Sequence, residues 1–190
     1  PTALKREVPP FHHEIYKNMK DRENILRLLI AAPRGTAKST LGSLIYPMHR
    51  IAFKGKDEEV FIVIISESQT QSINFLSRIK YHLGNSANFK SLFGDLGPNT
   101  APRWTQNDVV LANGTRILAV GTGQRVRGFI EGDTRPTDII VDDFESELNA
   151  ATPEARTKNR KWITEAVIPS LADEGRIIII GTVISEDCFL

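Results

Sequence analysis

The sequence predicts an α/β fold with a mainly parallel central sheet flanked by helices. Four short runs of residues are continuously apolar, and each has the length of a buried strand. Helical patterns separate most of these runs, and parallel strands need such crossover segments between them. At 190 residues the chain can bury one full core, so we expect a single domain over residues 1–190.

The first half of the chain contains two of the apolar runs, and both are too short for an amphipathic helix. The predicted elements are a helix over 11–20, a strand over 25–31, a helix over 38–51, a strand over 60–65 and a helix over 68–83. Pro47 is expected to end or kink the second helix, because proline lacks an N–H group.

The second half begins with residues 84–107, which are rich in Gly, Asn and Pro and predict a long irregular connection. Asn113-Gly114 lies between the segments 108–112 and 116–120 and predicts a β-hairpin with a two-residue loop, hence a β-insertion or an antiparallel edge of the sheet. The remaining predicted elements are a strand over 138–142, a helix from Thr152 to about Leu171, and a strand over 177–180.

Composition narrows the function only slightly. Lys and Arg total 24 against 23 Asp and Glu, so the net charge of +1 indicates no class of partner. The single cysteine, Cys188, excludes an internal disulfide and fits a reducing compartment. No apolar stretch approaches the roughly 18 residues that span a bilayer, so no membrane association is expected. The chain lacks an initiator Met, and we expect it to be a piece of a longer protein.

Residues 32–40, Ala-Pro-Arg-Gly-Thr-Ala-Lys-Ser-Thr, follow the first strand and predict a phosphate-binding loop. Backbone N–H groups at a helix N-terminus bind phosphate because they have no intrahelical partners. Lys38 would reach the β- and γ-phosphates, and the Ser39 hydroxyl would ligate Mg²⁺. The usual pattern has glycine where this chain has Ala32 and Ala37, and a left-handed alanine costs about 1–2 kcal/mol. The alternative is an ordinary strand–turn–helix with a solvent-facing lysine.

An acidic segment follows the third predicted strand. Asp142 ends this strand at the carboxyl edge of the sheet, where α/β proteins bind ligands, and would hold Mg²⁺ through water. Asp143 or Glu145 would orient and deprotonate an attacking water. The alternative is a solvated acidic turn. Together with the loop, this segment makes binding of a nucleoside triphosphate by a P-loop NTPase the leading interpretation.

Three further residues are candidates for contact with the γ-phosphate. Arg34 lies within the loop, and Thr182 follows the last strand. Arg127 lies in a glycine-rich segment and would act as an arginine finger on a neighbouring subunit. The alternative for each is an ordinary surface or turn residue.

These segments resemble the ATPase domain of the large terminase subunit of tailed bacteriophages and prophages, the motor that packages DNA into procapsids. The resemblance extends from Pro9 to Thr182. It is carried by the loop from Arg34 to Thr40, the Arg127-Gly128 pair, the Arg-Pro-Thr-Asp sequence at 135–138 and the acidic strand end. This family is similar in fold to the P-loop ATPases that use an additional catalytic glutamate.

The resemblance implies a role for each matching position. The residues implied to bind ATP are Pro33, Arg34, Gly35, Thr36, Ala37, Lys38, Ser39, Thr40 and Thr182, with Ser39 and Asp142 at Mg²⁺. His12 falls where many relatives carry a glutamine that reads adenine, and Arg127 matches an arginine that acts in trans. Asp143 falls where the catalytic Glu usually stands, but it is one methylene shorter, so Glu145 stays an alternative catalyst.

The resemblance also implies partners and a location. These are double-stranded DNA in the full motor, the portal, the small terminase subunit, and further copies of the chain in a ring, in the host cytoplasm at the procapsid portal. The family's nuclease domain is absent, so we expect no DNA cleavage. Other interpretations are a helicase-like motor, a P-loop kinase, or a scaffold whose alanine-substituted loop binds no nucleotide.

Overall fold

The computed structural model describes residues 8–124, 134–146, 149–184 and 187–190. Within them a seven-stranded sheet has the order β1-β7-β6-β2-β5-β4-β3. Strands β1, β7, β6, β2 and β5 are parallel, whereas β4 and β3 add an antiparallel edge. The strands are β1 (Arg27–Ala31), β2 (Phe61–Ser66), β3 (Arg103–Trp104), β4 (Asp108–Val110), β5 (Arg116–Gly121), β6 (Asp138–Asp142) and β7 (Arg176–Gly181).

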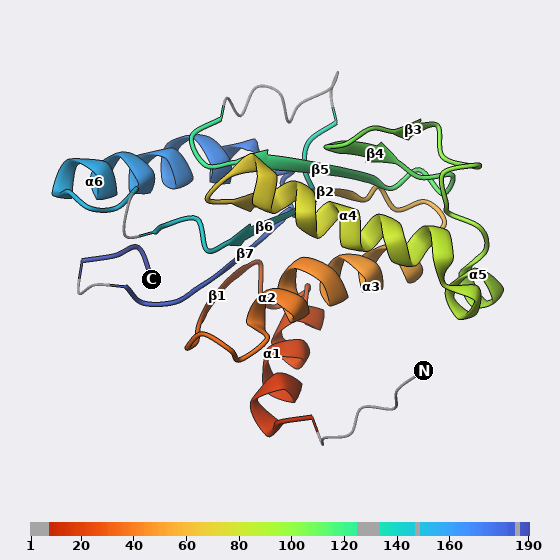
Figure 1. Cartoon of the computed structure of the whole chain (residues 1–190), viewed down its shortest axis with the longest axis horizontal. Helices are drawn as coiled ribbons and strands as arrows, with labels where there is room; N and C mark the ends of the chain where they lie inside the picture. Colours follow the sequence, from red (N-terminus) through yellow and green to blue (C-terminus); the bar gives the residue numbers. More distant parts are fainter. Residues whose placement is uncertain (1–7, 125–133, 147–148, 185–186) are drawn as a thin grey trace.

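Helices cover both faces of this sheet and give three layers (Figure 1). They are α1 (Pro10–Lys20), α2 (Lys38–Thr40), the π-helical η1 (Leu41–Ile45), α3 (Tyr46–Ala52), α4 (Gln69–Asn85), α5 (Ala87–Phe93), α6 (Pro153–Lys161), the π-helical η3 (Trp162–Val167) and the 3₁₀ turn η4 (Ile168–Ser170). The segments α2, η1 and α3 follow one another without a break, as do α6, η3 and η4.

The two faces of β2 show how the core is divided. Ile62 and Ile64 pack with residues of α3 and α4, whereas Val63 and Ile65 face a second cluster that includes residues of η3. Alternate residues of a strand point to opposite faces. All six residues of β2 are buried, and the first five are apolar, as expected for the central strand of a doubly covered sheet.

The structure confirms the predicted α/β class and mainly parallel sheet, and it corrects two details. The hairpin loop has three residues, 112–114, because Leu111 N donates to Thr115 O. Gly114 takes the left-handed position (φ 82°) that such a loop requires. The prediction of an irregular connection over 84–107 was wrong, since this segment completes α4 and contains α5 and β3.

Pro47 does not end its helix. The turn before it is π-helical, and Tyr46 N donates to the carbonyl of Leu41, five residues back. Proline cannot donate to the carbonyl four residues before it, and a wider turn accommodates this loss. The helix therefore continues from Lys38 to Ala52, and its length matters for the site below.

Gly42 lies where this helix crosses β7. A Cβ atom at this position would lie 1.8 Å from Ile180 Cδ1. We expect Gly42→Ala to lower the free energy of unfolding by about 1–3 kcal/mol through overpacking, measured by urea denaturation. Gly84→Ala in α4 is the control, because its Cβ would meet no atom closer than 3.6 Å. The control should be neutral or stabilising by up to about 1 kcal/mol. Equal stability of the two variants would contradict the close packing.

A buried carboxylate organises the amino edge of β6. Asp138 is 1% exposed and accepts hydrogen bonds from Tyr46 Oη (2.5 Å), Arg50 Nε (3.3 Å) and Thr137 Oγ1 (2.9 Å), and it also pairs with Arg22. Burial, followed by the charge of Asp138, raises the pKa of Tyr46 to about 12. Tyr46 therefore stays a neutral hydrogen-bond donor, and the two arginines supply the compensating charge.

Candidate functional site

The polar residues of the candidate site lie at the carboxyl ends of four neighbouring parallel strands. In sheet order, β1 leads into the loop 32–40, β7 into Thr182, β6 into Asp143 and β2 into Glu67. They surround a cleft of about 430 Å³. It is lined by Arg34, Gly35, Ala37, Lys38, Ser39, Thr40, Glu67, Gln71, Asp143, Glu145, Ser146, Thr182 and Ile184. The structure thus brings together most of the residues predicted from the two motifs.

The loop holds its shape by one internal hydrogen bond, one hydrogen bond to β7 and two left-handed residues. Thr36 Oγ1 donates to Pro33 O (2.8 Å), and Ala32 N donates to Gly181 O (3.1 Å). Gly35 has φ 81°, and Ala37, directly before the helix, has φ 58° and ψ 19°. The left-handed alanine carries the expected cost of about 1–2 kcal/mol. Ala32 does not carry it, since its φ is not positive.

Lys38 is buried beneath this loop. Its side chain is 5% exposed, and Nζ donates to Thr182 Oγ1 at 2.9 Å. The Thr182 hydroxyl in turn donates a hydrogen bond to Ala32 O at 3.3 Å. This geometry excludes the alternative of a solvent-facing lysine. It places an ammonium group at the floor of the cleft, with one neutral partner and no carboxylate within ion-pair distance in the described part of the chain.

Asp142 lies next to this lysine and is fully buried. Its Oδ1 accepts from Ser39 Oγ (2.9 Å) and its Oδ2 from Ser43 Oγ (2.6 Å). Burial raises the pKa of Asp142 to about 6, with help from the charge of Asp143, while the two serine hydrogen bonds and Lys38 oppose the shift. Because the folded carboxyl keeps its proton to a higher pH than the unfolded one, this group lowers the stability of the fold as the pH rises from 3.8 to about 6.

The two candidate catalytic acids differ in their surroundings. Asp143 has a left-handed backbone (φ 44°), and its N–H donates to Ile180 O at 2.8 Å. Strained residues of this kind cluster at functional sites. Glu145 also lines the cleft, but its Oε2 accepts from the backbone N–H of Phe189 at 2.8 Å. Glu145 therefore holds the segment that follows β7, a role that Asp143 does not share.

The remaining predicted residues are placed as follows. His12 Nε2 lies 2.6 Å from Thr36 O, so the histidine touches the loop from α1. Arg34 is exposed at the mouth of the cleft. Arg127 lies outside the described residues, which end at residue 124 in this part of the chain.

Sequence reasoning missed Glu67, Gln71, Ser43 and Ser146. Ser43 stands four residues after Ser39, and the helical period was a signal that both would face the same carboxylate. Glu67 stands directly after a predicted buried strand, but only the strand order shows that this strand neighbours β6. Glu67 Oε1 accepts from Ser146 Oγ at 2.5 Å, which joins the ends of β2 and β6.

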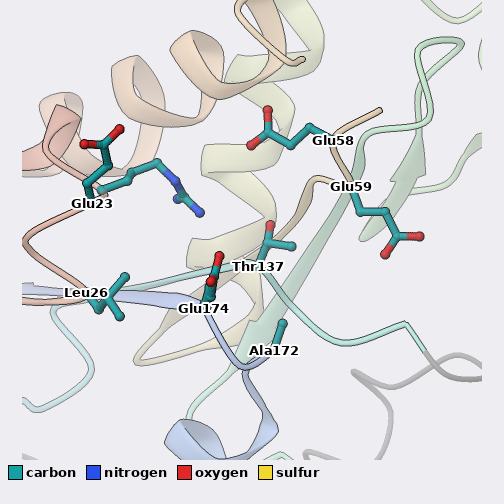
Figure 2. Close-up of a pocket in the computed structure, with 9 residues that line it drawn as sticks. Glu23, Leu26, Glu58, Glu59, Thr137, Ala172 and Glu174 are labelled. Atoms are coloured by element: carbon teal, nitrogen blue, oxygen red, sulfur yellow. The ribbon is translucent and has the colours of Figure 1, made fainter. Parts of the chain in front are cut away.

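A second cavity, of about 570 Å³, lies at the opposite edge of the sheet (Figure 2). Its lining includes Arg22 and the glutamates Glu23, Glu58, Glu59 and Glu174. It contains none of the residues predicted for the site. It also lies at the amino ends of β2, β6 and β7, whereas open α/β sheets bind ligands at the carboxyl ends. We therefore assign the candidate site to the smaller cleft.

Within residues 8–124, 134–146, 149–184 and 187–190, no group of three or more His, Cys, Asp or Glu side chains is placed to hold a metal ion. The helices of these ranges all lack the length and apolar character that a membrane span needs.

Comparison with known proteins gives one similarity, and it concerns the fold. No protein-family model and no curated protein matches the sequence. Among solved structures, the crystal structure of the HK97 bacteriophage large terminase is similar over 95% of this chain, with a TM-score of 0.56 and 11% sequence identity. The chain spans 34% of the length of that protein. At this identity the similarity shows a shared fold.

Proposed function

We propose that the chain is the ATPase motor domain of a large terminase subunit, a P-loop ATPase of the additional-catalytic-glutamate type that hydrolyses ATP in the presence of Mg²⁺. One observation carries the proposal: two hydrogen-bonded pairs, Lys38 with Thr182 and Ser39 with Asp142, lie together beneath a cleft that the loop closes on one side. The fold shared with the HK97 large terminase supports the proposal of a packaging motor.

The residues beneath the cleft fit a Mg²⁺ ion. A hydroxyl and a carboxylate, from Ser39 and Asp142, are the oxygen ligands that this ion prefers. The neighbouring Ser66, paired with Asp142 in the sheet register, has a fully buried hydroxyl without a hydrogen-bond partner in the described part of the chain. The Ser66 hydroxyl lacks a partner among the described residues, and burial disfavours the charged form of Asp142 beside it. Both groups would gain a partner from a water molecule bound to Mg²⁺. Bound Mg²⁺ would neutralise charge on the β- and γ-phosphates.

The chain's own residues would then act as follows. The loop N–H groups and Lys38 hold the β- and γ-phosphates, and Arg34 adds positive charge at the cleft mouth. Asp143 accepts a proton from the attacking water. The water oxygen bonds to the γ-phosphorus, the bond from phosphorus to the β,γ-bridging oxygen breaks, and its electron pair leaves with ADP. The proton passes on to inorganic phosphate or solvent.

Arg127 is proposed to complete this site from a neighbouring copy of the chain. A missing arginine finger costs about 10³–10⁵ in rate. Turnover of the isolated chain should therefore be slow and should rise faster than linearly with protein concentration. In the whole motor a ring of subunits would use the reaction to move double-stranded DNA, with the portal and the small terminase subunit as partners.

The separation of the two acids gives a direct test by ADP release from Mg-ATP. We expect Asp143→Asn to lower kcat by about 10²–10⁴-fold, the usual contribution of a general base. Glu145→Gln should cost far less, because an amide oxygen still accepts from Phe189 N–H. The reverse ranking would move the catalytic role to Glu145. No turnover by the wild type at any concentration would contradict the proposed ATPase.

ADP release and equilibrium binding of ATP separate two of the alternatives. A P-loop kinase would release ADP only when a phosphate acceptor is present. A scaffold would show no measurable ATP binding at equilibrium, either in the wild type or in Lys38→Ala. A helicase-like motor would share the reaction but would need a second motor domain with arginines of its own.

A further inference from the structure

A third carboxylate, that of Glu67, faces the cleft, and the proposed reaction gives it no role. Glu67 follows β2 directly and is half-buried among the lining residues. Ser146 Oγ donates to its Oε1 at 2.5 Å. Its other oxygen, Oε2, accepts no hydrogen bond from residues that the structure describes. The serine therefore fixes the carboxylate and leaves one oxygen available to a ligand.

The order of the strands places Glu67 at one end of a row. From the loop after β1, the row passes Thr182 at β7 and Asp143 at β6 before it reaches Glu67 at β2. Adjacent strands lie about 4.8 Å apart, so Glu67 stands roughly 14 Å across the sheet from the strand that carries the loop. It is thus the carboxylate of the row farthest from the groups proposed to hold the β-phosphate.

Phosphoryl transfer requires the attacking and leaving oxygens to lie roughly in line on opposite sides of the phosphorus. The leaving oxygen would be held at the loop, so the attacking water must stand on the far side, between Asp143 and Glu67. A water has two hydrogens, and two acceptors fix both of them. One lone pair is then directed at the phosphorus, and this orientation lowers the entropic part of the barrier.

We propose that Glu67 is a catalytic residue, the second acceptor of the attacking water beside Asp143. This inference rests on the proposed function and deepens it. Asp143 takes the proton as the water oxygen bonds to phosphorus and ADP leaves. Glu67 keeps the other hydrogen bond throughout and gains no proton. Ser146 is a positioning residue, because it acts through Glu67.

The test compares glutamates at the two ends of the same strand, in the full 190-residue chain. Glu67→Gln is paired with Glu59→Gln, an exposed glutamate that precedes β2 at the opposite edge (Figure 2). ADP release is measured over a range of Mg-ATP concentrations, with Lys38→Ala as the blank. In Glu67→Gln the single amide oxygen would accept from Ser146 and the NH₂ group would face the water, so the water would lose one acceptor. We expect kcat to fall by about 10–100-fold, below the full contribution of a general base, with KM changed less than threefold. Glu59→Gln should match the wild type in both constants.

Three outcomes would overturn the inference. One is wild-type kcat in Glu67→Gln while Lys38-dependent turnover persists, which leaves the proposed ATPase standing. Another is a loss in Glu67→Gln that Ser146→Ala reproduces in full, together with a raised KM, since both variants would then act through the shape of the turn. The third is a wild type without Lys38-dependent turnover, which removes the proposed function as well. Thermal unfolding of each variant confirms that it is folded.

Discussion

Lys38→Ala is expected to lower the rate of ADP release by at least about 10²–10³-fold, the cost of removing one preorganised donor from a transition-state site. Lys38 Nζ stands at the floor of the cleft and donates a hydrogen bond to Thr182 Oγ1 at 2.9 Å. The buried ammonium makes its hydrogen bond to a neutral hydroxyl, and an anionic phosphate would add a charged acceptor. The measurement is ADP release from Mg-ATP together with equilibrium binding of ATP.

Removal of Lys38 should leave the fold intact, because the lost ammonium makes no ion pair within the described residues. Lys38→Met keeps most of the apolar stem and should behave like Lys38→Ala in activity. Lys56→Ala, at an exposed lysine of the opposite edge, controls for a change in net charge. Unchanged ATP affinity and turnover in Lys38→Ala would show that the loop does not bind the triphosphate.

Asp138→Ala is expected to lower the free energy of unfolding by about 3–5 kcal/mol, the usual cost of removing one partner of a buried ion pair. The substitution would leave Arg50, which is 8% exposed in its side chain, without one of its two carboxylates. It would also remove the acceptor of the Tyr46 hydroxyl, which lies 2.5 Å away. Urea denaturation at pH 7 measures the loss.

Two variants sharpen this measurement. Asp57→Ala, at an exposed position, should change the stability by less than about 0.5 kcal/mol. Tyr46→Phe removes one hydrogen bond to Asp138 and should fall between the two, at about 1.5–3 kcal/mol for a bond to a charged acceptor. An Asp138→Ala variant as stable as the wild type would mean that the arginines find other partners.

The sequence supported the fold well wherever a local pattern decides the structure. Strand β6 was predicted at its observed bounds, because three apolar residues follow an aspartate and a second aspartate ends the run. The N-terminal cap of α6 was also predicted from a local pattern, and the Thr152 side chain accepts a hydrogen bond from Ala155 N as a cap should. The prediction for residues 84–107 failed because the helix in this segment, α5, is only seven residues long and has no buried residue. Its sequence therefore shows no helical repeat of apolar residues.

The residues of the candidate site also fall into two groups, those that a local motif identifies and those whose contacts depend on the order of the strands. Lys38, Ser39 and Asp142 were found because each belongs to a motif with a fixed place relative to a strand. The pairing of Lys38 with Thr182 was not predictable, since it depends on β7 lying between β1 and β6. Glu67 stayed hidden for the same reason. Such contacts join residues far apart in the chain, and the order of strands decides them.

The helix over 38–52 is tied to both ends of β6. Ser39 and Ser43 bind Asp142 at the carboxyl end of the strand, and Tyr46 and Arg50 bind Asp138 at the amino end.

In mechanical terms these four bonds make the helix and the strand one rigid body. Sliding the helix by a single turn would break bonds at both ends at once, so a ligand that displaces the loop must carry β6 with it. The displacement would then reach Asp138, whose partners Arg22 and Thr137 line the second cavity. The helix and β6 thus connect the two edges of the sheet as one rigid unit, so a movement at one edge is passed to the other directly.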